Sequence, residues 1–154
     1  GAYNTISRSQ RRHFDWYEGP ARYMGSVYNG VDVESFPFCA DRGQDLLFLG
    51  RVAPEKGPQI AIEVALRVGR RLIIAGKVDN YDRAFFESVV EPLIDGRQIV
   101  FLGEADARLK RELYARAMCV LMPLTWEEPF GLVMADAMGC GTPVIAFRRG
   151  SAPC

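Results

Sequence analysis

The sequence predicts an α/β fold built on a doubly wound parallel sheet, and two observations indicate it. From Leu46 onward, short apolar runs alternate with stretches of helical character, which is the pattern of βαβ units. The apolar runs are nearly continuous, as in strands buried on both faces. We expect strands at 46–50, 71–75, 99–102, 119–123 and 143–147. Because crossovers between parallel strands are right-handed, they would form a Rossmann-like sheet in the order 3-2-1-4-5.

The helices expected between these strands carry recognisable start and stop signals. Gly57-Pro58 opens the first, with proline at the first helical position. The second covers 81–94, and Pro92 should kink or end it. Asp106 can cap the third, which runs to about Met118, and the fourth covers 131–138. The spacing of apolar residues predicts a buried stripe on the first helix, formed by Ile60, Val64 and Val68.

Residues 1–45 lack this regular alternation. We expect a short amphipathic helix over 9–19, a short strand at Val27-Tyr28 and a turn at Asn29-Gly30, a dipeptide typical of tight turns. The sequence therefore predicts an irregular segment over 1–45 followed by a single α/β domain over 46–154.

Composition excludes several classes of protein. The chain has 154 residues and 49% hydrophobic content, which suits one globular domain with a real core. Nineteen basic and nineteen acidic residues cancel, so charge gives no reason to expect nucleic acid or an anionic bilayer as a partner. No apolar run reaches the roughly 18 residues of a membrane span, and no leader pattern opens the sequence. We expect a cytoplasmic protein.

Cysteine spacing and missing motifs narrow the chemistry further. The four cysteines are scattered, without a CxxC pair, which favours free thiols over a zinc site or disulfides. Neither GxGxxG nor GxxxxGKS occurs, so nicotinamide dehydrogenases and phosphate-loop nucleotidases lack their markers. The cysteines are Cys39, Cys119, Cys140 and Cys154.

The most informative segment is 126–143, which lies between the last two expected strands. A helix that begins at the carboxyl ends of parallel strands points free N–H groups and its positive dipole end into the crevice there. The amides of Phe130, Gly131 and Leu132 can therefore bind an anion. Glu128 precedes them and would repel an anion, but its carboxylate can accept hydrogen bonds from hydroxyls. Phosphate beside hydroxyls indicates a sugar phosphate.

Four motifs carry a resemblance to a known family. The run EEPFGLVMADAMGCGTPVIA (127–146) resembles the signature of the retaining glycosyltransferases of the two-Rossmann-domain type, family four, also called glycosyl transferases group 1. In that signature seven residues separate two acids, here Glu128 and Asp136. GRVAPEKG (50–57), AGKVD (75–79) and FLGE (101–104) resemble the family's other landmarks in the same order. The resemblance covers about residues 46 to 150.

The resemblance implies roles for individual residues. Arg51 and Lys56 would hold the diphosphate, and Glu128 would contact hydroxyls of the donor sugar. Asp136 would reach the ribose, although the family usually has the longer Glu there. The backbone amides at 130–132 would bind phosphate. Further residues expected around the donor are Gly50, Gly103 and Glu104.

The resemblance also implies what else the protein needs. ISRSQ (6–10) and NGVD (29–32) resemble landmarks between the two domains of the family. The resemblance therefore implies that 1–45 is the interdomain linking segment with the end of a preceding acceptor domain, and that 46–154 is the nucleotide-sugar-binding domain. The sheet would be truncated at its C-terminal edge, which would leave the strand at 143–147 open to self-association. His13 should be a surface residue. Trp126 can pack on its loop or line the sugar pocket, and we favour packing. We expect no cofactor and no metal, because cations and a helix terminus can offset the leaving charge.

The function expected from these residues is the donor-binding half of a retaining glycosyltransferase. It would bind a nucleoside diphosphate sugar, whose base and sugar the sequence does not specify. Two alternatives stay open: a stand-alone nucleotide-binding or interaction module, and a sugar-phosphate epimerase or phosphorylase on the same fold. A phosphorylase would need a pyridoxal-phosphate lysine, for which the sequence has no motif.

Overall fold

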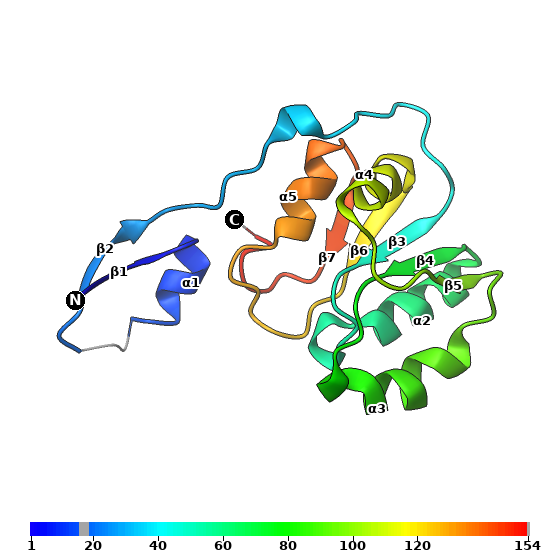
Figure 1. The fold of residues 1–154 in the computed structure, drawn as a ribbon, viewed down its shortest axis with the longest axis horizontal. Coiled ribbons are helices and arrows are strands. Elements are labelled where there is room, and N and C mark those ends of the chain that lie inside the picture. Colours follow the sequence, from blue (N-terminus) through cyan, green and yellow to red (C-terminus); the bar gives the residue numbers. More distant parts are fainter. Residues whose placement is uncertain (16–18, 154) are drawn as a thin grey trace.

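Five parallel strands form the central sheet of the protein, which is described here from a computed structural model covering residues 1–15 and 19–153 (Figure 1). The order β5-β4-β3-β6-β7 corresponds to the predicted 3-2-1-4-5, and every pairing is parallel. Each strand is one or two residues shorter than expected. The strands are β3 (Leu46–Leu49), β4 (Leu72–Ala75), β5 (Ile99–Phe101), β6 (Cys119–Met122) and β7 (Val144–Ala146).

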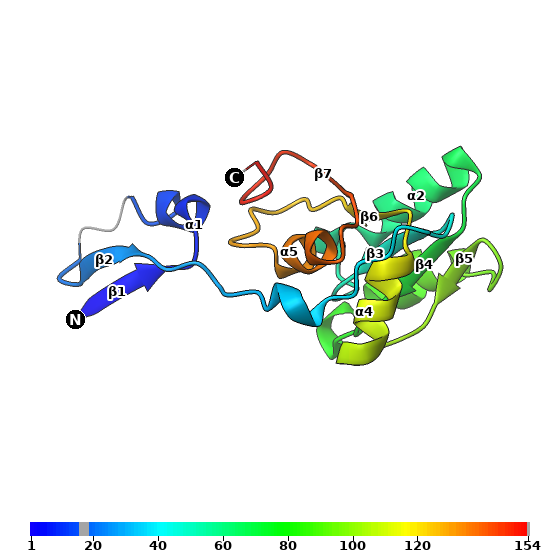
Figure 2. The same cartoon turned by 90° about the horizontal axis from the view of Figure 1, so that it is seen from above.

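Helices cover both faces of this sheet, as a doubly wound fold requires (Figures 1 and 2). On one face, α2 (Pro58–Val68) and the helical segment that begins with α3 (Arg83–Phe85) pack over the even side chains of β3 and β4. On the other face, α4 (Ala107–Arg116) and α5 (Leu132–Gly139) pack over Leu47, Leu49 and Val120. The prediction of a doubly wound Rossmann-like sheet is confirmed.

The buried face of α2 differs from the prediction. Val64 and Val68 are exposed, and the buried residues are Pro58, Ala61, Ile62 and Ala65. The apolar residues of this helix lie on more than one stripe, so periodicity alone does not define the inner face. Small alanines let the helix approach the sheet closely, and close packing decides the rotation.

The other helices follow their local signals. After α3 the chain widens into a π-helical turn, Phe86–Val90, and narrows into a 3₁₀ turn, Glu91–Leu93, in which Pro92 ends the helix. The Asp106 carboxylate caps α4 by accepting the Leu109 N–H at 2.7 Å. The fourth predicted helix begins at Leu132, because Gly131 is its left-handed N-cap with φ of 82°.

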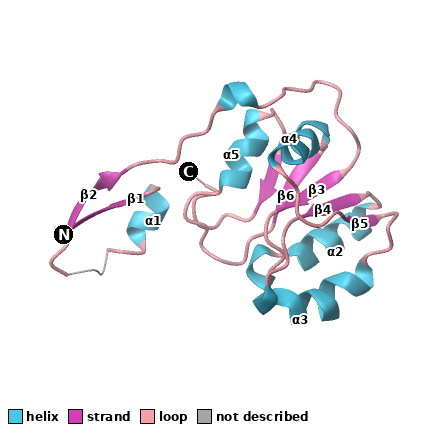
Figure 3. Ribbon diagram, in the orientation of Figure 1, coloured by secondary structure: helices cyan, strands magenta, loops and turns pink. Residues whose placement is uncertain are grey.

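The N-terminal segment forms a small two-stranded unit beside the central sheet and its helices (Figure 3). Strands β1 (Ala2–Thr5) and β2 (Arg22–Ser26) pair in parallel beside α1 (Arg8–Arg12). Helix α1 is shorter than the predicted 9–19, and residues 16–18 of that range lie outside the described residues, as does Cys154.

The segment after β2 departs from the prediction. Only Val27 continues the pairing, by donating its N–H to Thr5 at 2.8 Å, and Asn29-Gly30 makes no turn. Instead the chain runs on past α5, where the Tyr28 and Phe130 rings lie 6.3 Å apart (Figure 1). This tertiary contact overrides the local preference for a turn. The predicted division between residues 45 and 46 stays a prediction.

Candidate functional site

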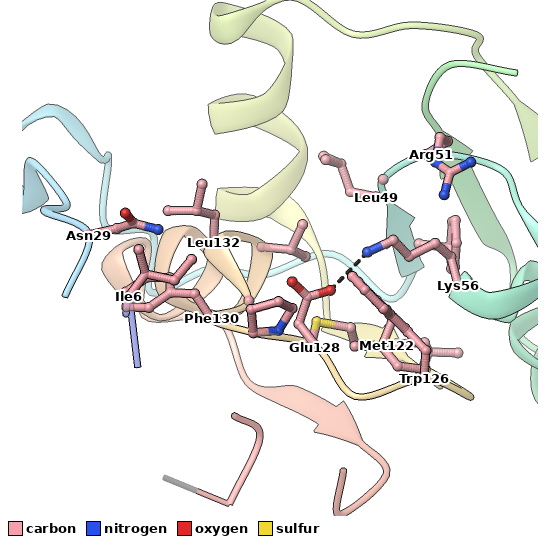
Figure 4. A pocket seen from close by; sticks show the side chains of 17 residues that line it. Ile6, Asn29, Leu49, Arg51, Lys56, Met122, Trp126, Glu128, Phe130 and Leu132 are labelled. Carbon is pink, nitrogen blue, oxygen red and sulfur yellow. Dashed lines mark hydrogen bonds and ion pairs between the residues drawn. The ribbon is translucent and has the colours of Figure 1, made fainter. Parts of the chain in front are cut away.

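A cavity of about 410 Å³ opens at the carboxyl ends of β3 and β6 (Figure 4). Its volume is in the range of small-molecule sites, and its place is where open α/β sheets bind ligands. The wall is formed by the loops after both strands, the start of α5, and two residues of the N-terminal unit. The polar and glycine residues of the lining are Gly50, Arg51, Lys56, Glu128, Gly131 and Asn29.

Two glycines allow the loops after β3 and β4 to approach each other. Gly50 has φ of 148°, a conformation that other residues rarely adopt. A Cβ atom at Gly76 would lie 1.7 Å from the Gly50 carbonyl oxygen, so no side chain fits there. This close approach holds the loops after β3 and β4 together, and Arg51 and Lys56 of the loop over 50–57 line the cavity.

Lys56 and Glu128 meet inside the cavity. The Lys56 Nζ lies 2.8 Å from Glu128 Oε2 and 4.5 Å from the centre of the Trp126 ring. The two side chains are 22% and 16% exposed, so the pair is partly shielded from water. Trp126 was expected to pack on its loop, but it lines the cavity and faces Lys56, because the loop after β6 turns its ring inward (Figure 4).

Arg51 faces three carboxylates that sequence reasoning did not connect with it. Its Nη1 lies 2.6 Å from Asp82 Oδ2, its Nη2 pairs with Glu55, and its Nε lies 4.0 Å from Asp79. The hydrogen bond from Lys77 is the main cause that lowers the pKa of Asp79. In sequence, only the i,i+4 spacing of Arg51 and Glu55 signals any of these contacts.

The start of α5 presents backbone donors to the cavity. Met134 and Ala135 donate their N–H groups to the Gly131 carbonyl at 2.9 and 3.3 Å, so the helical hydrogen bonds begin there. The amides of 131–133 precede that first turn, and all three residues line the cavity. This end of α5 can therefore hold an anion.

A segment after β7 supports the loop that carries Glu128. The Glu127 carboxylate accepts the Gly150 N–H at 2.6 Å, and the Ser151 N–H donates to the Glu128 carbonyl at 2.9 Å. These contacts point Glu127 away from Lys56 and leave Glu128 as the acid that pairs with it. Sequence reasoning chose Glu128 from its motif and missed the supporting residues.

The remaining expected residues lie outside the main cavity. Glu104, Lys77 and Lys110 line a second cavity of about 190 Å³, which shares Leu49, Gly50 and Arg51 with the first. Gly103 lines neither cavity, and its carbonyl accepts the Gly76 N–H at 2.8 Å.

Asp136 also lines neither cavity. Burial raises its pKa, and the charge of Lys110, which lines the second cavity, partly opposes the rise. Asp136 is therefore within reach of the Lys110 charge, but neither cavity reaches its side chain.

Two properties of the described residues bear on other functions. No group of three or more histidine, cysteine or acidic side chains there could hold a metal ion, and the absence of a metal in the reaction stays a prediction. None of the helices in the described part of the chain has the length and apolar content needed to cross a membrane. His13 is exposed at the end of α1 and does not line the main cavity, in agreement with its expected place on the surface.

Comparison with known proteins assigns the chain to a family. The family model described as glycosyl transferases group 1 matches residues 38–153. The chain belongs to this family. As a glycosyl transferases group 1 member, it is 35% identical to an uncharacterized glycosyltransferase of Methanocaldococcus jannaschii, over 95% of this chain and 42% of that protein. It is 30% identical to the D-inositol 3-phosphate glycosyltransferase of Mycolicibacterium smegmatis, over 82% of this chain and 32% of the relative.

Solved structures agree with the assignment to glycosyl transferases group 1. AviGT4, a glycosyltransferase involved in avilamycin A biosynthesis, superimposes with a TM-score of 0.78 and 28% identity, over 96% of this chain and 45% of that one. Anabaena HepE, solved with UDP and glucose, gives a TM-score of 0.80 at 23% identity over 97% and 45%, a likeness of fold alone. The chain spans less than half the length of each of these four proteins.

Proposed function

We propose that this chain is the donor-binding half of a retaining glycosyltransferase, which moves a sugar from a nucleoside diphosphate sugar to an acceptor hydroxyl. One observation carries the proposal: a single cavity gathers the Lys56 ammonium, the Glu128 carboxylate and the amide end of α5. The cation and the amides suit a diphosphate, and the carboxylate suits sugar hydroxyls. Membership of glycosyl transferases group 1 supports the same reaction.

The two cavities suggest how the donor lies. The diphosphate would bind Lys56 and the amides at the start of α5, with the hexose against Glu128. The nucleoside would extend past Gly50 and Arg51 toward the smaller cavity, bordered by Glu104. Gly103 would border the base through its backbone, and Asp136 would bind the ribose after a small movement of its side chain or through a water molecule.

The chemistry follows from where charge develops. As the bond to the sugar breaks, negative charge grows on the departing diphosphate and the sugar becomes oxocarbenium-like. The positive end of α5 stabilises that charge from a fixed position, and Lys56 and Arg51 stabilise it once they turn from their carboxylate partners to the phosphate. An acceptor hydroxyl attacks from the face that the diphosphate leaves. Neither a covalent protein nucleophile nor a metal or other cofactor is part of this proposal.

The acceptor site would lie in the part of such proteins that this chain does not match, since the relatives are more than twice as long. We therefore expect the 154-residue chain to bind donor and to transfer essentially no sugar. The three described cysteines, Cys39, Cys119 and Cys140, are free thiols, and this supports a reducing, cytoplasmic location.

Calorimetry on the 154-residue chain tests the proposal, with UDP-glucose, GDP-mannose and ADP-glucose as probes. We expect one of the three nucleotide sugars to bind clearly more tightly than the other two. Binding of none of the three nucleotide sugars would contradict donor binding. Measurable sugar transfer by this chain alone would contradict the assignment to half of an enzyme, whereas a full-length protein that binds donor without transfer would support an interaction module.

A further inference from the structure

The ammonium of Lys56 already has a partner before any donor arrives. Glu128 comes from the loop before α5, Lys56 comes from the turn before α2, and their charged atoms are 2.8 Å apart (Figure 4). Both side chains are mostly shielded, so their attraction is stronger than that of a pair in open water. Trp126 is a second partner of the ammonium, with Nζ 4.5 Å from the ring centre.

A diphosphate that binds in this cavity perturbs the ion pair between Lys56 and Glu128. The amides at the start of α5 lie only a few residues beyond Glu128, so phosphate bound there comes close to the carboxylate. The phosphate attracts Lys56 and repels Glu128. Binding therefore weakens the contact between Lys56 and Glu128 and leaves the carboxylate in need of new hydrogen-bond donors.

We propose that Glu128 competes with the diphosphate for Lys56, so that the site discriminates between an intact nucleotide sugar and the bare nucleoside diphosphate. The inference rests on the proposed function. An intact donor brings sugar hydroxyls that donate to Glu128 and replace the lost ammonium. A bare nucleoside diphosphate brings no such hydroxyls and carries one more ionisable oxygen on its terminal phosphate. The Glu128 carboxylate then continues to attract the Lys56 ammonium, and its negative charge repels the terminal phosphate.

The competition has a consequence for turnover. After the sugar has left, Glu128 has no hydroxyl partners and forms its ion pair with Lys56 again. The loss of Lys56 weakens the binding of the nucleotide that is left. The Trp126 ring stays against the ammonium, with Nζ 4.5 Å from its centre, and limits how far Lys56 moves. Glu128 would thus act twice, by binding the sugar and by helping release of the spent nucleotide.

The replacement Glu128→Gln separates these effects, because Gln keeps the side-chain size and removes the charge. Calorimetry would compare UDP with UDP-glucose, GDP with GDP-mannose and ADP with ADP-glucose, and use the pair that binds the unaltered chain. We expect the bare nucleotide to bind about three- to tenfold more tightly to the variant, since a competing and repelling charge is gone. The nucleotide sugar should bind about tenfold or more weakly, as for hydrogen bonds lost to a charged acceptor.

Glu127→Gln is the matched control. It removes the same charge one residue away, from a carboxylate that accepts the Gly150 N–H and points away from Lys56. We expect both affinities of this variant to stay within about twofold of the unaltered chain, as for an exposed charge. A damaged fold would weaken the binding of both ligands. Misfolding therefore cannot raise the affinity for one member of a pair and lower the affinity for the other.

The outcomes distinguish this inference from the proposed function. If the unaltered chain binds both members of a pair, and Glu128→Gln leaves the affinity for the bare nucleotide unchanged or lower, competition is overturned and donor binding stands. If the unaltered chain binds neither member of any pair, donor binding fails and the competition fails with it.

Discussion

The guanidinium of Arg51 lies 2.6 Å from the carboxylate of Asp82, and this contact joins the loop after β3 to the turn before α3. Glu55 and Asp79 approach the same guanidinium from two other sides. The Asp82 side chain is only 11% exposed, so its charge depends on this partner. Arg51 therefore connects two loops at the edge of the cavity, whatever it contributes to the donor.

Arg51→Ala should lower the free energy of unfolding by about 1–3 kcal/mol, because three carboxylates lose their shared cation and one of them is nearly buried. Urea denaturation followed by circular dichroism would measure it. The control is Arg67→Ala, which removes an exposed cation paired with Glu63 on α2 and should cost less than about 0.5 kcal/mol. Equal losses in the two variants would mean that the cluster around Arg51 adds no stability.

Lys56→Ala should weaken binding of the preferred nucleoside diphosphate by about 1.5–3 kcal/mol, the range for a lost charge-assisted hydrogen bond. Arg51→Ala should weaken it less, because Arg51 must give up its carboxylates to reach phosphate. Calorimetry would give both values, with Arg67→Ala again as the control. Unchanged affinity in both variants would show that neither Arg51 nor Lys56 holds the diphosphate.

Asp136→Asn should stabilise the protein at neutral pH while weakening the binding of nucleotide and nucleotide sugar alike. Burial holds the folded-state pKa of Asp136 above its ordinary value of 3.8, so the folded protein binds the proton more tightly than the unfolded chain does. Stability then falls as pH rises through the interval between the two pKa values, and the full cost persists above it.

The gain from Asp136→Asn should therefore be present at pH 7 and disappear below the ordinary pKa of 3.8, where the carboxyl is protonated in both states. Urea denaturation at several pH values would follow it. Glu112→Gln, which removes a carboxylate at an exposed position of α4, is the control for the loss of a negative charge at the surface. A gain that is the same at every pH would show that the buried charge is not its cause.

Gly76→Ala should cost about 3 kcal/mol or prevent folding, since overpacking against a rigid neighbour is expensive. The new Cβ would lie 1.7 Å from the Gly50 carbonyl oxygen, which belongs to the backbone of another loop and cannot rotate away. Gly30→Ala is the matched control, because nothing lies within 4 Å of the place its new methyl group would take and its φ is not positive. Thermal melting would compare the two variants. Similar melting temperatures for both would contradict the close approach of Gly76 to the Gly50 carbonyl.

Self-association should occur through β7, which pairs only with β6 among the described residues. Ile145 in this edge strand is 59% exposed, and an apolar edge is a template for pairing with another chain. Sedimentation should show the average mass rising with concentration, and Ile145→Lys should suppress the rise. A monomer at every concentration would contradict the prediction.

Several features could be predicted from the sequence because their signals are local. The apolar runs gave the five strands and their order once crossover handedness was applied. Asp106 marked the start of α4, and Pro92 marked the end of the helix before β5. The segment around Glu128 predicted a helix start beside the sheet, and the structure places it there. Each of these signals is contained within a few neighbouring residues.

Other features depended on tertiary contacts that no local pattern encodes. The inner face of α2 was set by close packing of alanines on the sheet, although its exposed valines are the stronger hydrophobic signal. Asn29-Gly30 has the sequence of a turn, but the contact between Tyr28 and Phe130 keeps that segment extended. In both cases the free energy of packing exceeded the small local preference.

The sequence by itself determined the sheet, the helices between its strands and the residues that line its carboxyl edge. Only the tertiary structure decided which of those residues pair. Lys56 meets Glu128 and Trp126, and Arg51 meets Asp82, across separations of 31 to 72 residues for the two ion pairs. The physical reason is that a strand or a cap depends on neighbours along the chain, whereas an ion pair between loops depends on the path of each loop and the rotamers that packing leaves open to it.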